Sequence, residues 1–322
     1  MHLWHSAFFT VDTRVDIFAV VVDIAMKLTH RQAVLLMVAC TMMWSIAGVV
    51  TRHLEHARSF EVTFWRSFFT LVSLLIILPL IHGRELLTKF KQGGAALWAS
   101  GVCWSVMFTA FMMALTMTSV ANVLITMSVG PMFTALMARF FIGHRLAART
   151  WFAIVLAGFG IAYMYAAQLN LDDAAQMTGM LVALGVPLAG AANWTIVQHS
   201  HAKGHDVDLV PAVLVGALIS SVVTLPLALP FQASLFDLGL LSTLGLVQLA
   251  IPCTLSVVCA RYLAAPEIAL LALLEIIFGI ALAWLGANEA PASSVLLGGS
   301  LVIGALFINE WLAFRERGRA SI

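Results

Sequence analysis

The stretch IALLALLEIIFGIALAWL, residues 268–285, is apolar throughout except for one carboxylate, Glu275. At about 1.5 Å per residue, a helix of this length approaches the ~30 Å hydrocarbon core of a bilayer. A carboxylate at the centre of a bilayer costs ~2.5–3.5 kcal/mol on insertion scales, so it is normally placed against protein or water. Glu275 therefore indicates a functional site inside a bundle of membrane helices.

The composition of the whole chain is that of an integral membrane protein. Of its 322 residues, 61% are hydrophobic and 10% are charged, whereas soluble domains carry about 25% charged residues. No period-two alternation typical of membrane barrels persists along the sequence, so an all-α fold is expected. The net charge of +1 gives no support for nucleic-acid binding. The four cysteines fit neither a disulfide framework nor a zinc site.

Polar and turn-forming clusters divide the chain into ten apolar segments that are long enough to cross a membrane. The expected spans are 32–51, 62–82, 95–116, 119–142, 150–167, 178–199, 209–229, 238–260, 265–286 and 293–313. Residues 1–31 are expected to form a cytoplasmic extension before the first span. Within this extension, residues 1–25 are either a dispensable or mis-assigned segment or an interfacial helix.

The distribution of Lys and Arg predicts that both termini lie in the cytoplasm. With this orientation only Arg52 and Arg58 fall on the opposite side, where the longest loop is acidic through Asp172 and Asp173. The twelve cytoplasmic basic residues are Lys27, Arg31, Arg84, Lys89, Lys91, Arg145, Arg149, Lys203, Arg261, Arg315, Arg317 and Arg319. We therefore expect a multi-pass protein of the plasma membrane, such as a bacterial inner membrane.

The two halves of the chain resemble each other. Residues 131–144 align with residues 276–289 at an offset of 145, and Trp44 aligns with Trp194 at an offset of 150. Each half, 32–167 and 178–314, contains five expected spans, so the second half must be inverted relative to the first. Inverted repeats are the architecture of many secondary transporters, which bind substrate between the halves near the membrane midplane.

Two charged side chains inside the spans are candidates for substrate binding. Glu275 either binds a substrate ammonium group, carries a coupling proton, or serves the fold by hydrogen-bonding neighbouring helices. Arg66 lies one turn inside the second span. It either binds a substrate carboxylate or extends to the interface beside Glu61 or Asp172, and the interfacial interpretation is favoured.

The remaining candidates are uncharged. Asn122 and Gln248 suit either substrate contacts or hydrogen bonds between helices. Trp44, Trp104 and Trp194 lie well inside their spans, where they either line a ligand pocket or pack against lipid and protein. Gly130 and Pro131 are expected to kink the fourth span, which either creates a hinge or relieves packing. Gly130 is also the repeat counterpart of Glu275.

Four motifs within these spans are MWS at 43–45, TFWRSF at 63–68, GPMFTAL at 130–136 and LEIIF at 274–278. They resemble motifs of the drug/metabolite transporter superfamily, specifically its EamA-type ten-helix members, over about residues 32–314. Two positions depart from the family pattern, because His144 replaces a Glu and Ile276 replaces a Pro. The resemblance implies a secondary transporter, often an exporter of amino acids or other small metabolites, that does not use ATP.

The expected function is therefore secondary active export of a small organic solute, such as an amino acid, an amine or a related metabolite or drug. Alternating access, no metal or other cofactor, and a coupling proton as a candidate are part of this expectation. An enzyme is not expected, because the spans contain no His-Glu-x-x-His motif, paired Asp residues or Ser/His dyad. The alternative is a non-transporting membrane receptor or regulatory partner protein, although the short loops leave little surface for a soluble partner.

Overall fold

A computed structural model describes residues 28–137, 139–140, 148–167, 174–202, 209–259, 262–263, 271–272 and 274–320. All regular secondary structure within these ranges is helical, as the composition predicts. Residues 1–27, the repeat motif at Gly143-His144 and the loop residues Asp172 and Asp173 lie outside the described residues.

Each predicted span corresponds to at least one helix. The first half contains α2 (His30–Thr51), α3 (Phe60–His82), η1 (Gly83–Glu85), α4 (Leu86–Met117), α5 (Val120–Met127), α6 (Gly130–Met137) and α7 (Ala148–Ala167). The second half contains α8 (Ala174–Ala183), α9 (Gly185–Ala202), α10 (Val210–Ala228), α11 (Leu235–Thr243), the π-helix η3 (Leu244–Ala250), α12 (Ile251–Cys259), α14 (Leu274–Ala287) and α15 (Ser293–Ala320).

Within the described residues, six helical segments are long and apolar enough to cross a membrane, namely His30–Thr51, Phe60–Ile81, Leu86–Met117, Ala175–Asn193, Val210–Ala228 and Leu235–Ser256. Four shorter apolar helical segments are Val120–Thr134, Ala148–Gly160, Leu274–Ala287 and Ser293–Asn309. The outer surface carries exposed large apolar side chains, including Leu75, Phe152, Phe159 and Leu285. Such a surface is suited to contact with lipid rather than water.

In the part of the chain that the structure describes, three of the predicted spans are interrupted. The fourth breaks at a turn at Ser128 and Val129, so Gly130 begins α6 and Pro131 lies in its first turn, where the missing N–H costs nothing. The sixth breaks at Leu184, between α8 and α9. The eighth contains η3 between α11 and α12, and π-turns of this kind are frequent at functional sites.

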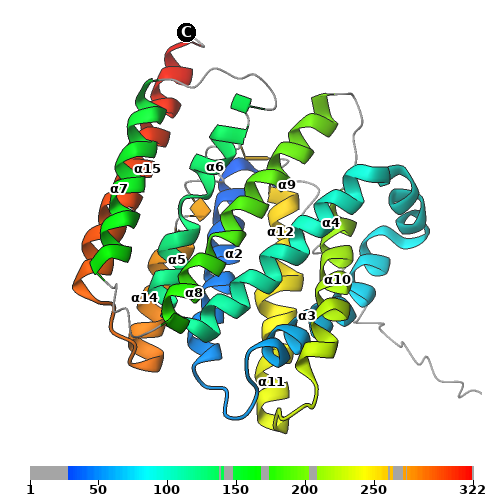
Figure 1. The fold of residues 1–322 in the computed structure, drawn as a ribbon. Helices are drawn as coiled ribbons and strands as arrows, with labels where there is room; N and C mark the ends of the chain where they lie inside the picture. Colours follow the sequence, from blue (N-terminus) through cyan, green and yellow to red (C-terminus); the bar gives the residue numbers. More distant parts are fainter. Residues whose placement is uncertain are drawn as a thin grey trace, which may run out of the picture.

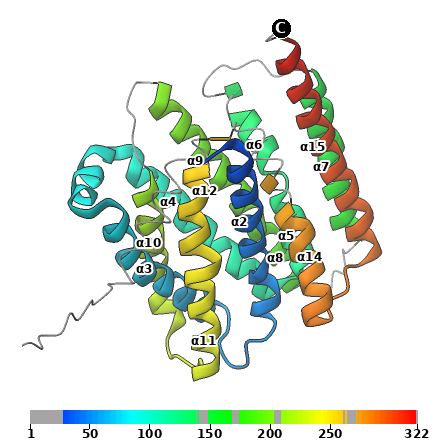
Figure 2. The ribbon, with the colours of Figure 1, turned by 180° about the vertical axis from the view of Figure 1, so that it is seen from behind.

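The helices form a bundle with two distinct edges (Figures 1 and 2). α7 and α15 lie side by side along one edge, and α3, α4 and α10 form the opposite side. α2, α5, α9, α12 and α14 lie between them. The α7–α15 pair is close because a Cβ atom on Gly160 would lie only 2.7 Å from the carbonyl oxygen of Gly298.

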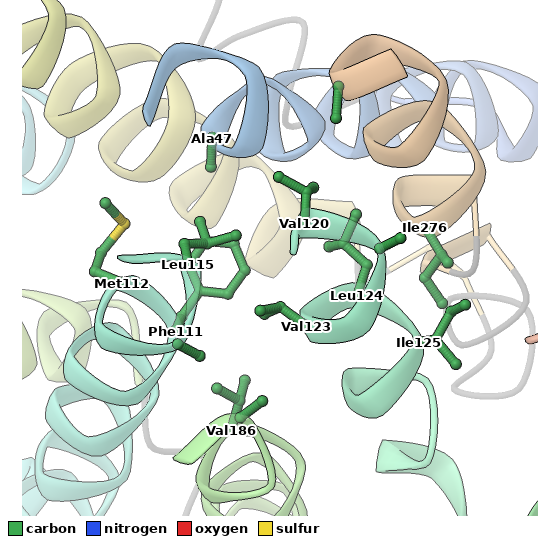
Figure 3. Packing of buried hydrophobic residues seen from close by; sticks show 14 of the residues in the cluster. Ala47, Phe111, Met112, Leu115, Val120, Val123, Leu124, Ile125, Val186 and Ile276 are labelled. Carbon is green, nitrogen blue, oxygen red and sulfur yellow. The ribbon is translucent and has the colours of Figure 1, made fainter. Parts of the chain in front are cut away.

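α5 lies near the centre of the main apolar core (Figure 3). Figure 3 shows Val123 and Leu124 of α5 among side chains of four other helices. These neighbours are Ala47 of α2, Phe111 and Leu115 of α4, Val186 of α9 and Ile276 of α14, all at most 7% exposed. Close packing of this kind holds helices together where lipid removes most of the hydrophobic driving force.

Candidate functional site

Arg66 of α3 lies in the interior of the bundle, with only 1% of its surface exposed. Its Nη1 donates to Gln248 Oε1 at 3.1 Å, and its Nη2 donates to the carbonyl oxygen of Phe108 at 3.4 Å. The rings of Phe108 and Phe111 lie with their centroids 5.7 and 5.5 Å from the guanidinium carbon, within cation–π range. No carboxylate among the described residues forms an ion pair with Arg66.

The prediction that Arg66 extends to the membrane interface is wrong. α3 directs this side chain toward α4 and η3, so the guanidinium reaches interior groups rather than the interface. Glu61 is engaged elsewhere, because its Oε1 accepts hydrogen bonds from the backbone N–H groups of Gln232 and Ala233, both at 2.9 Å. Asp172, the other predicted partner, lies outside the described residues.

Gln248 is brought to Arg66 by η3. Its side chain is 3% exposed and bridges two helices, because Oε1 accepts from Arg66 and Nε2 donates to the carbonyl oxygen of Trp44 at 3.4 Å. η3 approaches α3 closely at Gly245, where a Cβ atom would lie 2.6 Å from Cβ of Phe69. Thr70 adds a hydrogen bond from Oγ1 to the carbonyl oxygen of Gly245 at 3.2 Å.

Glu275 lies partly buried on α14, against α2. Its backbone carbonyl accepts a hydrogen bond from Ser45 Oγ at 3.1 Å. Cys253 of α12 packs in the same apolar cluster as Trp44 and lies near both Arg66 and Glu275. Trp44, Arg66, Gln248, Cys253 and Glu275 therefore form one group, which we call the central polar cluster.

Other predicted site residues lie elsewhere in the bundle. Asn122 lies in the first turn of α5, where its Nδ2 donates to Thr118 Oγ1 at 3.0 Å. Trp104 lies one turn before Phe108 on α4, and a Cβ atom on Gly216 of α10 would overlap Cβ of Trp104. Trp104 is thus part of the contact between α4 and α10.

Two further predictions concern α6 and α9. Gly130 and Pro131 follow the break in the fourth span, whose action as a hinge stays a prediction. Trp194 belongs to α9, and its side chain lies outside the described residues.

Of the predicted substrate-binding residues, the structure brings together four, namely Trp44, Arg66, Gln248 and Glu275. No group of three or more His, Cys, Asp or Glu side chains in the described ranges is arranged to hold a metal ion.

Arg52 and Glu289 join the helix ends on one side of the bundle, which we call the Arg52 end. Arg52 Nε lies 2.5 Å from Glu289 Oε2, and its Nη1 and Nη2 donate to the carbonyl oxygens of Leu115 and Thr118 at 2.6 and 2.8 Å. Glu289 Oε1 accepts from the N–H of Val120 at 2.6 Å. These contacts satisfy backbone groups that the end of α4 and the start of α5 would otherwise leave unpaired.

Two further carboxylates hold loops at the Arg52 end. Asp237 accepts hydrogen bonds from the N–H groups of Glu55, His56 and Ala57 at 2.8, 3.0 and 3.0 Å, and it also caps its own helix at Ser234. Glu61 performs the reciprocal task on the loop before α11. Each half of the chain therefore supplies a carboxylate that holds a loop of the other half.

Sequence reasoning missed several of these residues. Ser234 and Asp237 have the spacing of a capping box, a signal that is visible in the sequence. Phe108, Phe111 and Cys253 carry no such signal, because apolar side chains occur at most positions of these helices. Only the rotation of each helix about its axis decides which of them faces Arg66.

The helical fold and the length of its apolar segments define a multi-pass membrane protein. Residues 31–166 match the model of the EamA-like transporter family, which belongs to the drug/metabolite transporter superfamily. This match confirms the resemblance seen in the sequence. Members of the EamA-like family are transporters rather than enzymes. The family domain implies membrane transport of small solutes.

Eighteen chains of solved structures match the fold. One of them, described only as the crystal structure of a protein, aligns with a TM-score of 0.56 and 14% sequence identity. The alignment covers 88% of this chain and 98% of the other, and at this identity it shows a shared fold alone. No curated protein sequence matches the chain.

Proposed function

We propose that the chain is a secondary active transporter, and specifically an exporter, that moves a small organic solute by alternating access. The observation that carries the proposal is the central polar cluster. It combines Trp44 and Arg66 of the first half with Gln248, Cys253 and Glu275 of the second inside an apolar bundle. Polar and charged groups placed this way in membrane proteins mark substrate or ion pathways.

The packing of the helices supports two inverted repeats, residues 32–167 and 178–314. In such a repeat, the first to fifth spans correspond in order to the sixth to tenth, so α2 corresponds to α9, α4 to α12, and α6 to α14. The contact of α2 with α12 then has its counterpart in the contact of α9 with α4, and the contact of α2 with α14 has its counterpart in that of α9 with α6. Likewise, the contact of α3 with η3 has its counterpart in that of α10 with α4. The pairs α3–α10, α5–α14 and α7–α15 map onto themselves. A pseudo-two-fold axis relating two inverted halves produces such a pattern.

The extent of the family match agrees with this division. It covers residues 31–166, which is close to the first predicted repeat. With such an axis between the repeats, the central polar cluster would lie at their interface, where secondary transporters bind substrate. Movement of one repeat against the other would then expose the cluster alternately at the two membrane surfaces.

The proposed orientation follows the distribution of basic residues. Both termini face the cytoplasm of a plasma membrane, such as a bacterial inner membrane, and the Arg52 end faces the opposite side. In this arrangement, Glu275 either binds a cationic group of the solute or takes up and releases a coupling proton. Both roles require that the carboxylate is accessible first from one side of the membrane and then from the other.

Flux measurements on purified protein in proteoliposomes test the proposal. Vesicles are loaded with labelled amino acids, amines and organic acids, and release is followed with and without a pH gradient. The wild type should release at least one solute, and Glu275→Gln should remove most of that flux while folding normally. The matched control is Glu85→Gln, because Glu85 is exposed and makes no side-chain cap.

Two results would count against the proposal. Unchanged flux and pH dependence in Glu275→Gln would exclude Glu275 from the transport site. Absence of flux for every solute, from a wild type that is folded and reconstituted, would favour the alternative of a non-transporting receptor or regulatory partner.

A further inference from the structure

We infer that the transported solute carries a carboxylate group and that Arg66 binds it through the edge formed by Nε and Nη2. This inference deepens the proposed function, since it assigns a substrate class to the central polar cluster. It rests on the hydrogen bonds, the charge and the surroundings of one guanidinium group.

The hydrogen bonds of Arg66 occupy mainly one part of the guanidinium. Nη1 donates to Gln248 Oε1 at 3.1 Å, which fixes the plane of the group. Nη2 has only a long contact of 3.4 Å to the carbonyl oxygen of Phe108. Nε is fully buried and has no hydrogen-bond partner. The N–H groups of Nε and Nη2 point in parallel, and this fork matches the two oxygens of a carboxylate.

Among the described residues, no acidic side chain balances the charge of Arg66. No ion pair within 4.0 Å joins Arg66 to an acidic side chain of the described residues, and this includes Glu275. Two phenyl rings and one amide oxygen compensate the charge only partly. A charged group in a membrane interior is expensive unless it is paired. An anionic ligand that binds in a fork would supply both the missing charge and the missing acceptor.

The neighbours of Arg66 indicate the rest of the solute. Phe108 and Phe111 are 3% and 6% exposed, and their rings lie against the guanidinium. Aromatic walls of this kind accommodate an apolar or aromatic body. The expected ligand is thus a small carboxylate with an apolar or aromatic body, rather than an amine or an uncharged alcohol.

Thermal unfolding of the purified full chain in detergent, at fixed pH and salt, tests this inference with three probes of matched size. The probes are 3-phenylpropanoate, 3-phenylpropylamine and 3-phenylpropan-1-ol, with hexanoate as a second, non-aromatic carboxylate. A ligand that binds only the folded state raises the unfolding temperature as its concentration rises. The two carboxylates should raise it in a saturable way, and the amine and the alcohol should not.

Variants identify the binding group. Arg66→Lys keeps the charge but removes the fork, and Arg66→Gln removes both, so each should weaken carboxylate binding by about tenfold or more. The matched control is Arg58→Gln, because Arg58 is exposed at the Arg52 end and should leave binding unchanged. If both Arg66 variants fail to fold, the comparison of probes on the wild type decides by itself.

The inference is overturned if the amine stabilises the wild type and the carboxylates do not. It is also overturned if Arg66→Lys and Arg66→Gln bind carboxylates as the wild type does, which would make Arg66 a purely structural residue. Failure of the proposed function is distinguishable, because carboxylate binding without flux in proteoliposomes contradicts transport alone. Flux of amines without carboxylate binding contradicts only the inference.

Discussion

Individual carboxylate side chains hold the loops and helix ends at the Arg52 end in place. Asp237 is 0% exposed, and its two oxygens accept from four backbone N–H groups in two separate loops. Glu289 likewise accepts from a backbone N–H at the start of α5. The Arg52–Glu289 pair itself is 27% and 22% exposed, so its charge attraction is modest and its hydrogen bonds to helix ends matter more.

Substitution of Asp237 by Asn should lower the free energy of unfolding by about 1–3 kcal/mol, because one acceptor oxygen becomes an NH₂ group facing backbone donors. Thermal unfolding of the purified variant measures the change. Glu55→Gln is the control, since the Glu55 side chain is 57% exposed and only its backbone N–H contacts Asp237. Equal unfolding temperatures for Asp237→Asn and the wild type would show that this carboxylate is dispensable.

At the scale of the element, η3 decides how the eighth predicted span meets α3. A π-turn adds a residue to the turn and shifts the side chains that follow it relative to a regular α-helix. Gly245 then allows backbone contact with α3, and Gln248, almost one turn later, reaches Arg66 and Trp44. The position of Gln248 in the central polar cluster thus depends on the π-helical geometry of η3 and on the absence of a side chain at Gly245.

Gly245→Ala should therefore destabilise the protein by about 1–3 kcal/mol, because the new methyl group would overlap α3. The same change should move Gln248 away from Arg66 and weaken carboxylate binding, as measured by ligand-dependent thermal shift. Gly239→Ala on α11 is the control, since a Cβ atom there would meet nothing within 4 Å. Identical behaviour of the two variants would contradict the importance of the η3–α3 contact.

At the scale of the whole molecule, the two halves are interleaved rather than stacked as separate domains. α2 of the first half packs against α12 and α14 of the second, and α4 packs against α9 and α10 (Figures 1 and 2). Asp237 and Glu61 add reciprocal contacts between the halves at the Arg52 end. If the bundle opens at the Arg52 end, these contacts must either break or move together with the helices that they join.

The proposed orientation is tested by labelling single introduced cysteines in intact cells with a membrane-impermeant maleimide. Arg58→Cys should be labelled from outside the cell, and Glu85→Cys should be labelled only after the membrane is permeabilised. Arg58 and Glu85 are both exposed, at opposite ends of α3. The unmodified chain sets the background, since Cys40, Cys253 and Cys259 are buried and Cys103 is half-buried. Labelling of both positions from the same side would contradict the orientation.

Much of the fold could be predicted from the sequence, whereas the site could be predicted only in part. Long apolar runs must become helices in lipid, because every backbone polar group must be satisfied within the segment. Glu275 and Gln248 were identified because polar groups are rare in such runs. The environment of Arg66 was predicted incorrectly, because sequence position near a helix end does not tell which way a side chain faces.

The amino-acid sequence alone is enough to predict the helical membrane class, the approximate positions of the apolar helices and the resemblance to a transporter family. These properties depend on the hydrophobicity of each segment taken separately, so they can be predicted from short stretches of sequence. Helix packing in three dimensions is needed to bring Arg66 to Gln248 and two phenyl rings, and to let Asp237 and Glu61 hold each other's loops. Those contacts join residues more than 150 positions apart or depend on helix rotation, and close packing between helices selects both.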